Sequence, residues 1–215
     1  MPTLRVAFDA LPLARWGSLF HVLLLEQPGI RLEWLPREFP RDDRPLLDRA
    51  DVGLFLEPPR EPGLEALSVG SSPMVVLMAA GHRLARHHEL RVADVLGEPF
   101  PDAPHMHQEW RAFWSLDAYR GGPPPAARLD AGNVHSAITA IASGDAIATF
   151  PASLADGLPH PGVIWLPLID GPTVATRLVW RAGDANPIIR TLVDIACDMF
   201  GHARGNVERP AAADG

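Results

Sequence analysis

Residues 137–155 read AITAIASGDAIATFPASLA, and this stretch decides the fold class. An apolar helical segment ends at Gly144, a short buried strand follows, and Pro151 opens a further helix. Small side chains throughout allow helix and sheet to approach each other closely. A unit of this kind commonly places a strand's carboxyl end and a helix N-terminus at a ligand crevice. The stretch therefore favours a small-molecule sensor over an enzyme.

The rest of the chain alternates between strand and helix periods, with Pro and Gly between the segments. Strands are expected at residues 4–8, 30–34, 51–56, 64–68 (as an edge strand), 73–79, 128–131, 146–150, 163–168 and 173–181. Helices are expected at residues 13–24, 43–49, 92–96, 109–116, 133–143, 151–156 and 187–200. The first part reads βαβαβ, which predicts a doubly wound α/β fold with a parallel sheet. Residues 73–79 are apolar enough for a strand buried on both faces of such a sheet.

Composition sets limits on the function. The 215 residues are 47% hydrophobic, which suits one or two lobes with real cores. The net charge of -7 and the scattered arginines argue against direct nucleic-acid binding. The chain shows neither an apolar run long enough to span a membrane nor a secretory leader, so a cytoplasmic location is expected.

Cysteine and histidine give weak signals. A lone Cys197 favours a buried structural thiol in a reducing compartment. His82, His87 and His88 sit beside arginines and are expected on a solvated surface. His105 and His107, with Asp102, would offer at most a weak metal or acid–base site, so no metal or other cofactor is predicted.

Several short motifs, taken together, resemble one bacterial family, the effector-binding domain of LysR-type transcriptional regulators. Residues 27–33 (QPGIRLE) resemble its "YPGVRLEL" junction, and residues 51–54 (DVGL) its "DLAL" strand. Residues 81–85 (GHRLA) resemble its "HPLA" turn, and residues 92–96 (VADVL) its "LADL" helix. Residues 141–154 resemble its "VAAGLGIALLPESL" block. The order of the motifs agrees over roughly residues 4–200.

The resemblance implies two Rossmann-like subdomains joined by two crossover strands, as in type II periplasmic-binding proteins. Subdomain I is expected at residues 1–74 and 175–205, subdomain II at residues 75–174, and a flexible tail at residues 206–215. It also implies a homodimer or higher oligomer, in which a first-lobe helix and strand meet the second lobe of the mate. The family's winged helix-turn-helix is missing, so this chain is expected not to bind DNA itself.

In this architecture the effector site is expected between the lobes, beside strand carboxyl ends and helix N-termini. The candidate ligand-binding residues are Asp9, Ala10, Leu11, Arg37, Glu57, Asp102, His105, Asn133, Thr149 and Pro151. Arg37 is the best candidate for pairing with an anionic group. Asp9, if unpaired, would repel a carboxylate effector.

No catalytic residue is predicted, because the chain lacks a GxSxG elbow, a Walker loop and a GxGxxG fingerprint. Two alternatives share the architecture: a solute-binding protein of a transporter, and a dehydratase-like enzyme acting on a small acid through Asp9, His105 or Asp145. Trp110 and Trp114, at i and i+4, share one helical face. Core packing is the default for this pair, and a stacking surface for an aromatic effector is the second interpretation.

Overall fold

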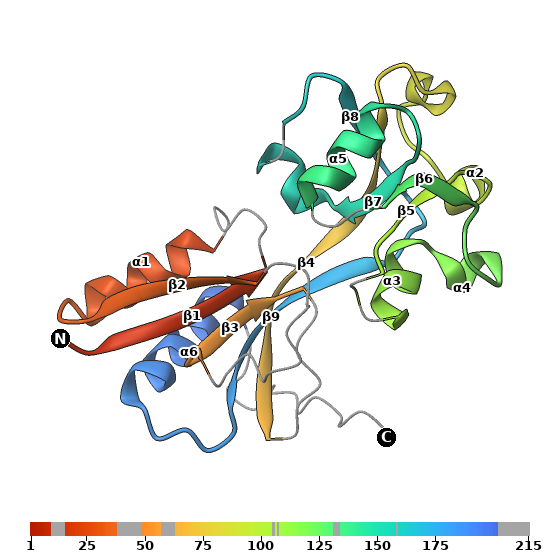
Figure 1. The fold of residues 1–215 in the computed structure, drawn as a ribbon. Coiled ribbons are helices and arrows are strands. Elements are labelled where there is room, and N and C mark those ends of the chain that lie inside the picture. The colour runs from red at the N-terminus through yellow and green to blue at the C-terminus, as the bar shows by residue number, and fades with distance from the viewer. Residues whose placement is uncertain are drawn as a thin grey trace. The chain divides into compact units, whose positions relative to one another are not determined.

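The computed structural model describes residues 1–9, 16–37, 49–56, 63–104, 106, 108–130, 134–157 and 159–201 (Figure 1). They divide into two compact units. The first holds the described residues of Met1–Arg37, Asp42–Ser71 and Ala175–Gly215, and the second holds those of Ser72–Val174. Two long strands, β4 (Leu64–Ala79) and β9 (Thr173–Arg181), contribute residues to both units. The α/β class with two crossover strands is thereby confirmed.

The first unit is built on a mixed sheet. β1 (Thr3–Asp9) lies between β2 (Arg31–Arg37) and β3 (Val52–Phe55) and is parallel to both. β9 pairs with β3 in the antiparallel direction, and β4 lies next to β9. The expected parallel sheet is therefore correct for the first three strands and wrong beyond them. Period-2 patterns identify a strand and its buried face, but they carry no information on the direction of its neighbour.

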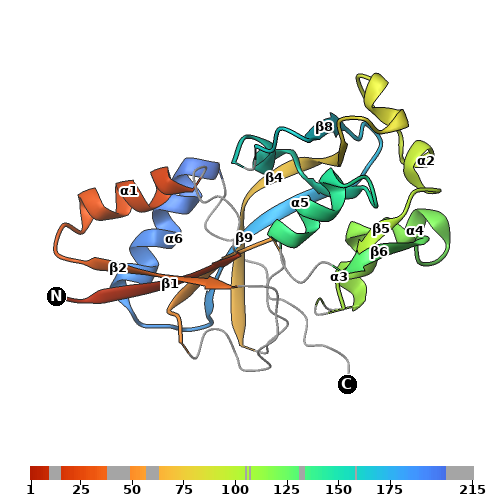
Figure 2. The ribbon, with the colours of Figure 1, turned by 45° about the horizontal axis from the view of Figure 1, so that its top comes forward.

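Helices α1 (Gly17–Glu26) and α6 (Pro187–Phe200) lie against each other in this unit (Figure 2). Their apolar faces join strand residues such as Leu4 and Leu54 in one buried cluster. α6 begins where the Asn186 side chain accepts the N–H of Ile188 at 3.0 Å, and it ends at Gly201 in the left-handed conformation. Cys197, only 2% exposed, belongs to this cluster, so its expected burial is confirmed.

The second unit is centred on the far half of β4. Its residues 74–78 are all buried, and β4 pairs with β7 (Ala148–Pro151) and β8 (Val163–Pro167), both antiparallel. β5 (Phe100–Asp102) and β6 (Ala126–Asp130) form a separate parallel pair. The helical segments of this unit are η3 (Arg83–Arg86), α2 (Val92–Val95), α3 (Gln108–Trp114), α4 (Asp117–Arg120), α5 (Val134–Ala142) and η4 (Ala152–Gly157).

Three sequence expectations need correction. The strands expected at 64–68 and 73–79 are one continuous strand, β4, because the intervening Gly-Ser-Ser does not turn the chain. The second strand is central, as expected, but its neighbours are antiparallel. The helix expected at 151–156 is the 3-10 segment η4, and α4 was not predicted at all. The helix expected at 43–49 lies almost entirely outside the described residues.

Candidate functional site

Three parallel strands of the first unit end at one edge of its sheet. β1 ends at Asp9 and β2 at Arg37, and these two residues are direct register partners. The Asp9 carboxylate accepts the backbone N–H of Leu56, directly after β3, at 2.8 Å. Asp9 therefore has a partner, and the condition under which it would repel a carboxylate effector is not met. Its carboxylate fixes the chain that leaves β3, which reduces its capacity to repel an anionic ligand.

Half of the candidate ligand-binding residues cannot be placed. Ala10, Leu11, Glu57, His105 and Asn133 lie outside the described residues, and Arg37 is described only in its backbone. Their assignment to a ligand site stays a prediction. The described candidates fall into the two units separately, Asp9 in the first and Asp102, Thr149 and Pro151 in the second.

Asp102 ends β5, where the chain turns toward α3. Its side chain is 53% exposed and lies 3.3 Å from the Arg111 guanidinium of α3, which is 40% exposed. Exposed pairs of this kind contribute little to stability, because solvent screens them and two long side chains must be held in place. Both groups are therefore available to exchange partners with a charged ligand.

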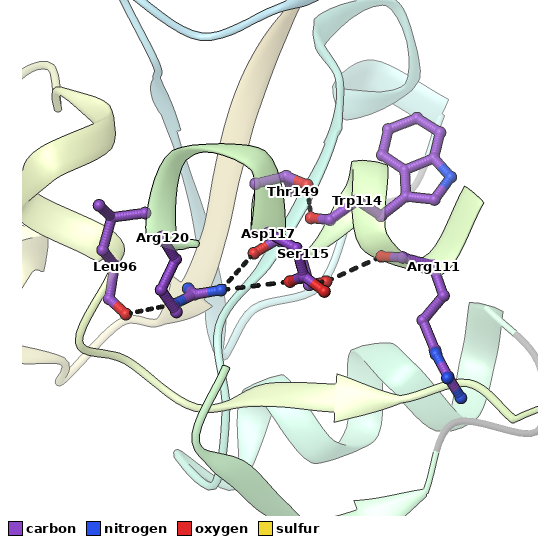
Figure 3. Close-up of polar contacts among 7 residues, drawn as sticks. All are labelled: Leu96, Arg111, Trp114, Ser115, Asp117, Arg120 and Thr149. Atoms are coloured by element: carbon purple, nitrogen blue, oxygen red, sulfur yellow. Dashed lines mark hydrogen bonds and ion pairs between the residues drawn. The ribbon is translucent and has the colours of Figure 1, made fainter. Parts of the chain in front are cut away.

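Thr149 and Pro151 belong to β7 and are both buried. The Thr149 hydroxyl donates to the backbone carbonyl of Trp114, the last residue of α3 (Figure 3). Pro151 pairs in register with Met74 of β4. In the described structure Thr149 ties α3 to the carboxyl end of β7, so it supports the strand end where ligand contacts were predicted.

We expect Thr149→Val to lower the free energy of unfolding by about 1–2 kcal/mol, because the buried Trp114 carbonyl loses its hydrogen-bond donor. Urea denaturation followed by circular dichroism measures this. The control is Thr139→Val: the Thr139 hydroxyl also donates to a carbonyl, that of His135 at 2.9 Å, but on an exposed helix surface. Equal stability losses in the two variants would contradict the structural role of Thr149.

Arg120 organises the corner between α3 and α4 (Figure 3). Its side chain is 13% exposed, and its Nε donates to the carbonyl of Leu96 at 2.7 Å. One terminal nitrogen donates to the carbonyl of Ser115 at 2.8 Å and lies 3.4 Å from Asp117. The guanidinium carbon also lies 5.4 Å from the centroid of the Phe100 ring. Burial lowers the pKa of Arg120, and the Asp117 carboxylate opposes this by favouring the charged form.

The corner encloses a strained residue. Leu116 adopts φ 61° and is 1% exposed, which places a non-glycine residue in the left-handed region inside the unit. The Ser115 hydroxyl donates to the carbonyl of Arg111 at 2.8 Å and contacts Asp117 at 2.7 Å. Sequence reasoning missed Arg111, Ser115 and Arg120. The pattern Ser115-x-Asp117-x-x-Arg120 was the only local signal of this network.

A second network corrects the expectation for His82. The imidazole side chain is 15% exposed rather than solvated, and its Nδ1 accepts the N–H of Leu84 at 3.2 Å. Its Nε2 lies 3.3 Å from the buried carboxylate of Glu98, which also pairs with Arg83. His82 therefore caps η3 and anchors it to the segment that precedes β5. His87 and His88 are exposed, as expected.

The described residues contain no group of three or more His, Cys, Asp or Glu that could hold a metal ion. His105 and His107, the histidines of the weak metal interpretation, lie outside them. In the same part of the chain, no helix is long and apolar enough to cross a lipid bilayer.

Comparison with known proteins identifies one family. The profile of the LysR substrate binding domain matches residues 2–200. The fold is similar to the BenM effector binding domain with its effector benzoate (18% identity, TM-score 0.73, 93% of this chain and 92% of that chain). It is also similar to the CcmR regulatory domain of Synechocystis PCC6803 in complex with 2-PG (19% identity, TM-score 0.74, 93% and 98%).

Full-length CbnR complexed with its target DNA matches at 19% identity and TM-score 0.72, over 92% of this chain and 68% of that chain. No curated protein sequence matches the chain. At these identities the structural likenesses establish the fold, and the profile match establishes the family.

Proposed function

The chain belongs to the LysR substrate binding domain family, and from this membership we propose that it is a sensor that binds a small organic effector without transforming it. The family match across nearly the whole chain is the observation that carries the proposal. The domains of this family belong to transcriptional regulators, so the match favours neither a transporter's solute-binding protein nor a dehydratase.

The chemistry of the described strand ends supports binding over catalysis. Asp9 accepts a backbone N–H, Asp102 pairs with an exposed arginine, and the Thr149 hydroxyl is used by a carbonyl. A hydrolytic or dehydrating site needs an acid or base in contact with a nucleophile or a reacting group. The three contacts named here hold the chain or join two elements, which is a structural role.

The compounds bound in two similar structures guide the choice of probe ligands. The BenM domain holds benzoate and the CcmR domain holds 2-PG, so small organic acids belong in a first screen. Arg37 and Arg111 are the residues that we propose for pairing with an anionic group. We further propose that the domain works in the cytoplasm and leaves DNA contacts to another part of its regulator.

Thermal-shift screening of small acids, amines and neutral aromatic compounds tests the sensor proposal. A ligand that binds only the folded state at 100 times its Kd adds about 2.7 kcal/mol, which raises the Tm of a domain this size by roughly 5–10 °C. The hit must be recovered unchanged after incubation with the protein. Conversion of the compound to a product would contradict a purely sensing role.

We also propose a homodimer that uses α1 and β2. Leu25 of α1 is 67% exposed and Trp34 of β2 is 40% exposed. The buried Phe20 ring of α1 lies 4.9 Å from that of Trp34, so the helix packs against this strand. β2 is also the terminal strand of its sheet. Apolar side chains beside an open strand edge favour association with another copy.

Leu25→Asp is expected to shift the protein from dimer toward monomer, because a desolvated carboxylate would have no partner in an apolar interface. Light scattering after size-exclusion chromatography, at several protein concentrations, measures the shift. Met199→Asp, at another exposed apolar position of the same unit (41% exposed), is the control and should leave the mass unchanged. A wild-type protein that is monomeric at every concentration would overturn the dimer proposal.

A further inference from the structure

Helix α3 carries aromatic side chains that the second unit buries only in part. Its seven residues, QEWRAFW, include two tryptophans and a phenylalanine, yet none of the seven is fully buried. By contrast α6, with fourteen residues, buries six of them. Leaving large rings partly in water gives up hydrophobic free energy of about 25 cal/mol for each Å² left exposed. The part of these rings that the described residues leave exposed can be contacted by a ligand.

The three rings of α3 continue into a longer series of contacts. Trp110 stacks on Phe113 at a centroid distance of 5.1 Å and an interplanar angle of 14°. Trp114 contacts both rings, at 5.4 Å and 5.2 Å. It also lies 6.3 Å from Phe150 of β7, which lies 6.0 Å from Trp165 of β8. All five side chains are only partly buried, and we call them the aromatic cluster.

The aromatic cluster lies on the opposite face of β7 from two of the predicted ligand contacts. Phe150 stands between the candidates Thr149 and Pro151 near the carboxyl end of β7. Phe150 pairs with Val75 of β4 and Trp165 pairs with Leu77. Paired residues share a face, and so do residues two apart on one strand, so both rings lie on the same face of the sheet.

A backbone contact of Trp114 helps to hold the aromatic cluster in place. The Thr149 hydroxyl fixes the Trp114 carbonyl, while the Trp114 indole points away from the polar network of Ser115, Asp117 and Arg120 (Figure 3). A surface that is already ordered loses little conformational entropy when a ligand binds. Aromatic faces also prefer the offset-stacked or edge-to-face geometry of other aromatic rings.

From these observations we infer that the effector is a small planar aromatic compound whose ring packs against the aromatic cluster. The inference rests on the proposed sensor function and specifies its ligand class. The charge of the ligand is a separate question, because the Asp102–Arg111 pair, which involves another residue of α3, offers one partner of each sign.

The experiment measures binding of matched probes by isothermal titration calorimetry. Benzoate and benzylamine are compared with cyclohexanecarboxylate and cyclohexylmethylamine, which keep the charged group and remove the π face. We expect an aromatic probe to bind at least about fivefold more tightly than its saturated counterpart. Comparing benzoate with benzylamine shows which charge the site accepts.

Variants locate the binding surface. Trp110→Leu and Phe150→Leu each keep an apolar side chain, and each should weaken binding of the aromatic probe by about five- to tenfold. Tyr119→Leu is the matched control, since Tyr119 of α4 is 50% exposed in the same unit but is not in the cluster. The two variants lie on different elements, so if one of them fails to fold, the other still tests the binding surface.

The outcomes separate the two proposals. Saturated probes that bind as tightly as aromatic ones, or cluster variants that bind like wild type, would overturn the aromatic inference while the sensor proposal stands. If neither these probes nor the compounds of the wider thermal-shift screen bind, the sensor proposal itself fails.

Discussion

Replacing Arg120 with methionine is expected to lower the free energy of unfolding by about 3 kcal/mol, because removing one member of a buried charged network strands its partners. The partners are the carbonyls of Leu96 and Ser115 and the carboxylate of Asp117. Methionine keeps most of the side-chain volume, so the loss reports the lost hydrogen bonds rather than a cavity. Urea denaturation followed by circular dichroism gives the value.

The left-handed backbone of Leu116 depends on the same contacts. A non-glycine residue in the left-handed region costs about 1 kcal/mol or more and persists only where its surroundings enforce it. Arg120 donates to the residue before Leu116 and lies beside Asp117, the residue after it. Without Arg120 the corner between α3 and α4 is free to relax, and the Trp114 end of α3 should relax with it.

Arg111→Met is the matched control for Arg120→Met. Arg111 also pairs with an aspartate, but the two side chains are 40% and 53% exposed, so a loss of no more than about 1 kcal/mol is expected. If the two variants lose the same free energy of unfolding, the Arg120 network stabilises the second unit no more than an exposed ion pair does.

Helices and strands whose ends are marked by neighbouring residues could be predicted from the sequence. Asn186-Pro187 and Gly201 mark both ends of α6, and the predicted helix matches the observed one residue for residue. β9 was likewise predicted with its observed bounds. The family resemblance then supplied the two-unit architecture, which no local pattern encodes.

Interactions between distant segments could not be read from the sequence. Residues 64–79 were divided because Gly70-Ser71-Ser72-Pro73 has the composition of a turn, whereas pairing with β9 in the first unit and with β7 and β8 in the second keeps the strand extended. His82 was assigned to a solvated surface because its partner Glu98 lies sixteen residues away. The acceptor of the Thr149 hydroxyl lies thirty-five residues away. For these residues the sequence gives the chemistry of the side chain but does not identify its partner.

Gly70→Ala is expected to destabilise the first unit by about 2–4 kcal/mol, because backbone strain and overpacking each cost roughly 1–3 kcal/mol. Gly70 of β4 has φ +155°, a conformation that side chains disfavour. A Cβ atom built there would lie 2.8 Å from the Trp16 ring. That ring cannot move aside easily, because Trp16 is only 9% exposed and its ring centroid lies 5.7 Å from that of Phe200 on α6.

Gly97→Ala separates these effects from the general consequence of adding a methyl group. Gly97 has no atom within 4 Å of its built Cβ, and its φ lies outside the strained range, so the stability should change by no more than about 0.5 kcal/mol. Thermal and urea unfolding of both variants, with near-ultraviolet circular dichroism to follow the tryptophan environment, make the comparison. If Gly70→Ala proves as stable as Gly97→Ala, Trp16 does not pack over β4 as described, and the α1–α6 side of the core must be arranged differently.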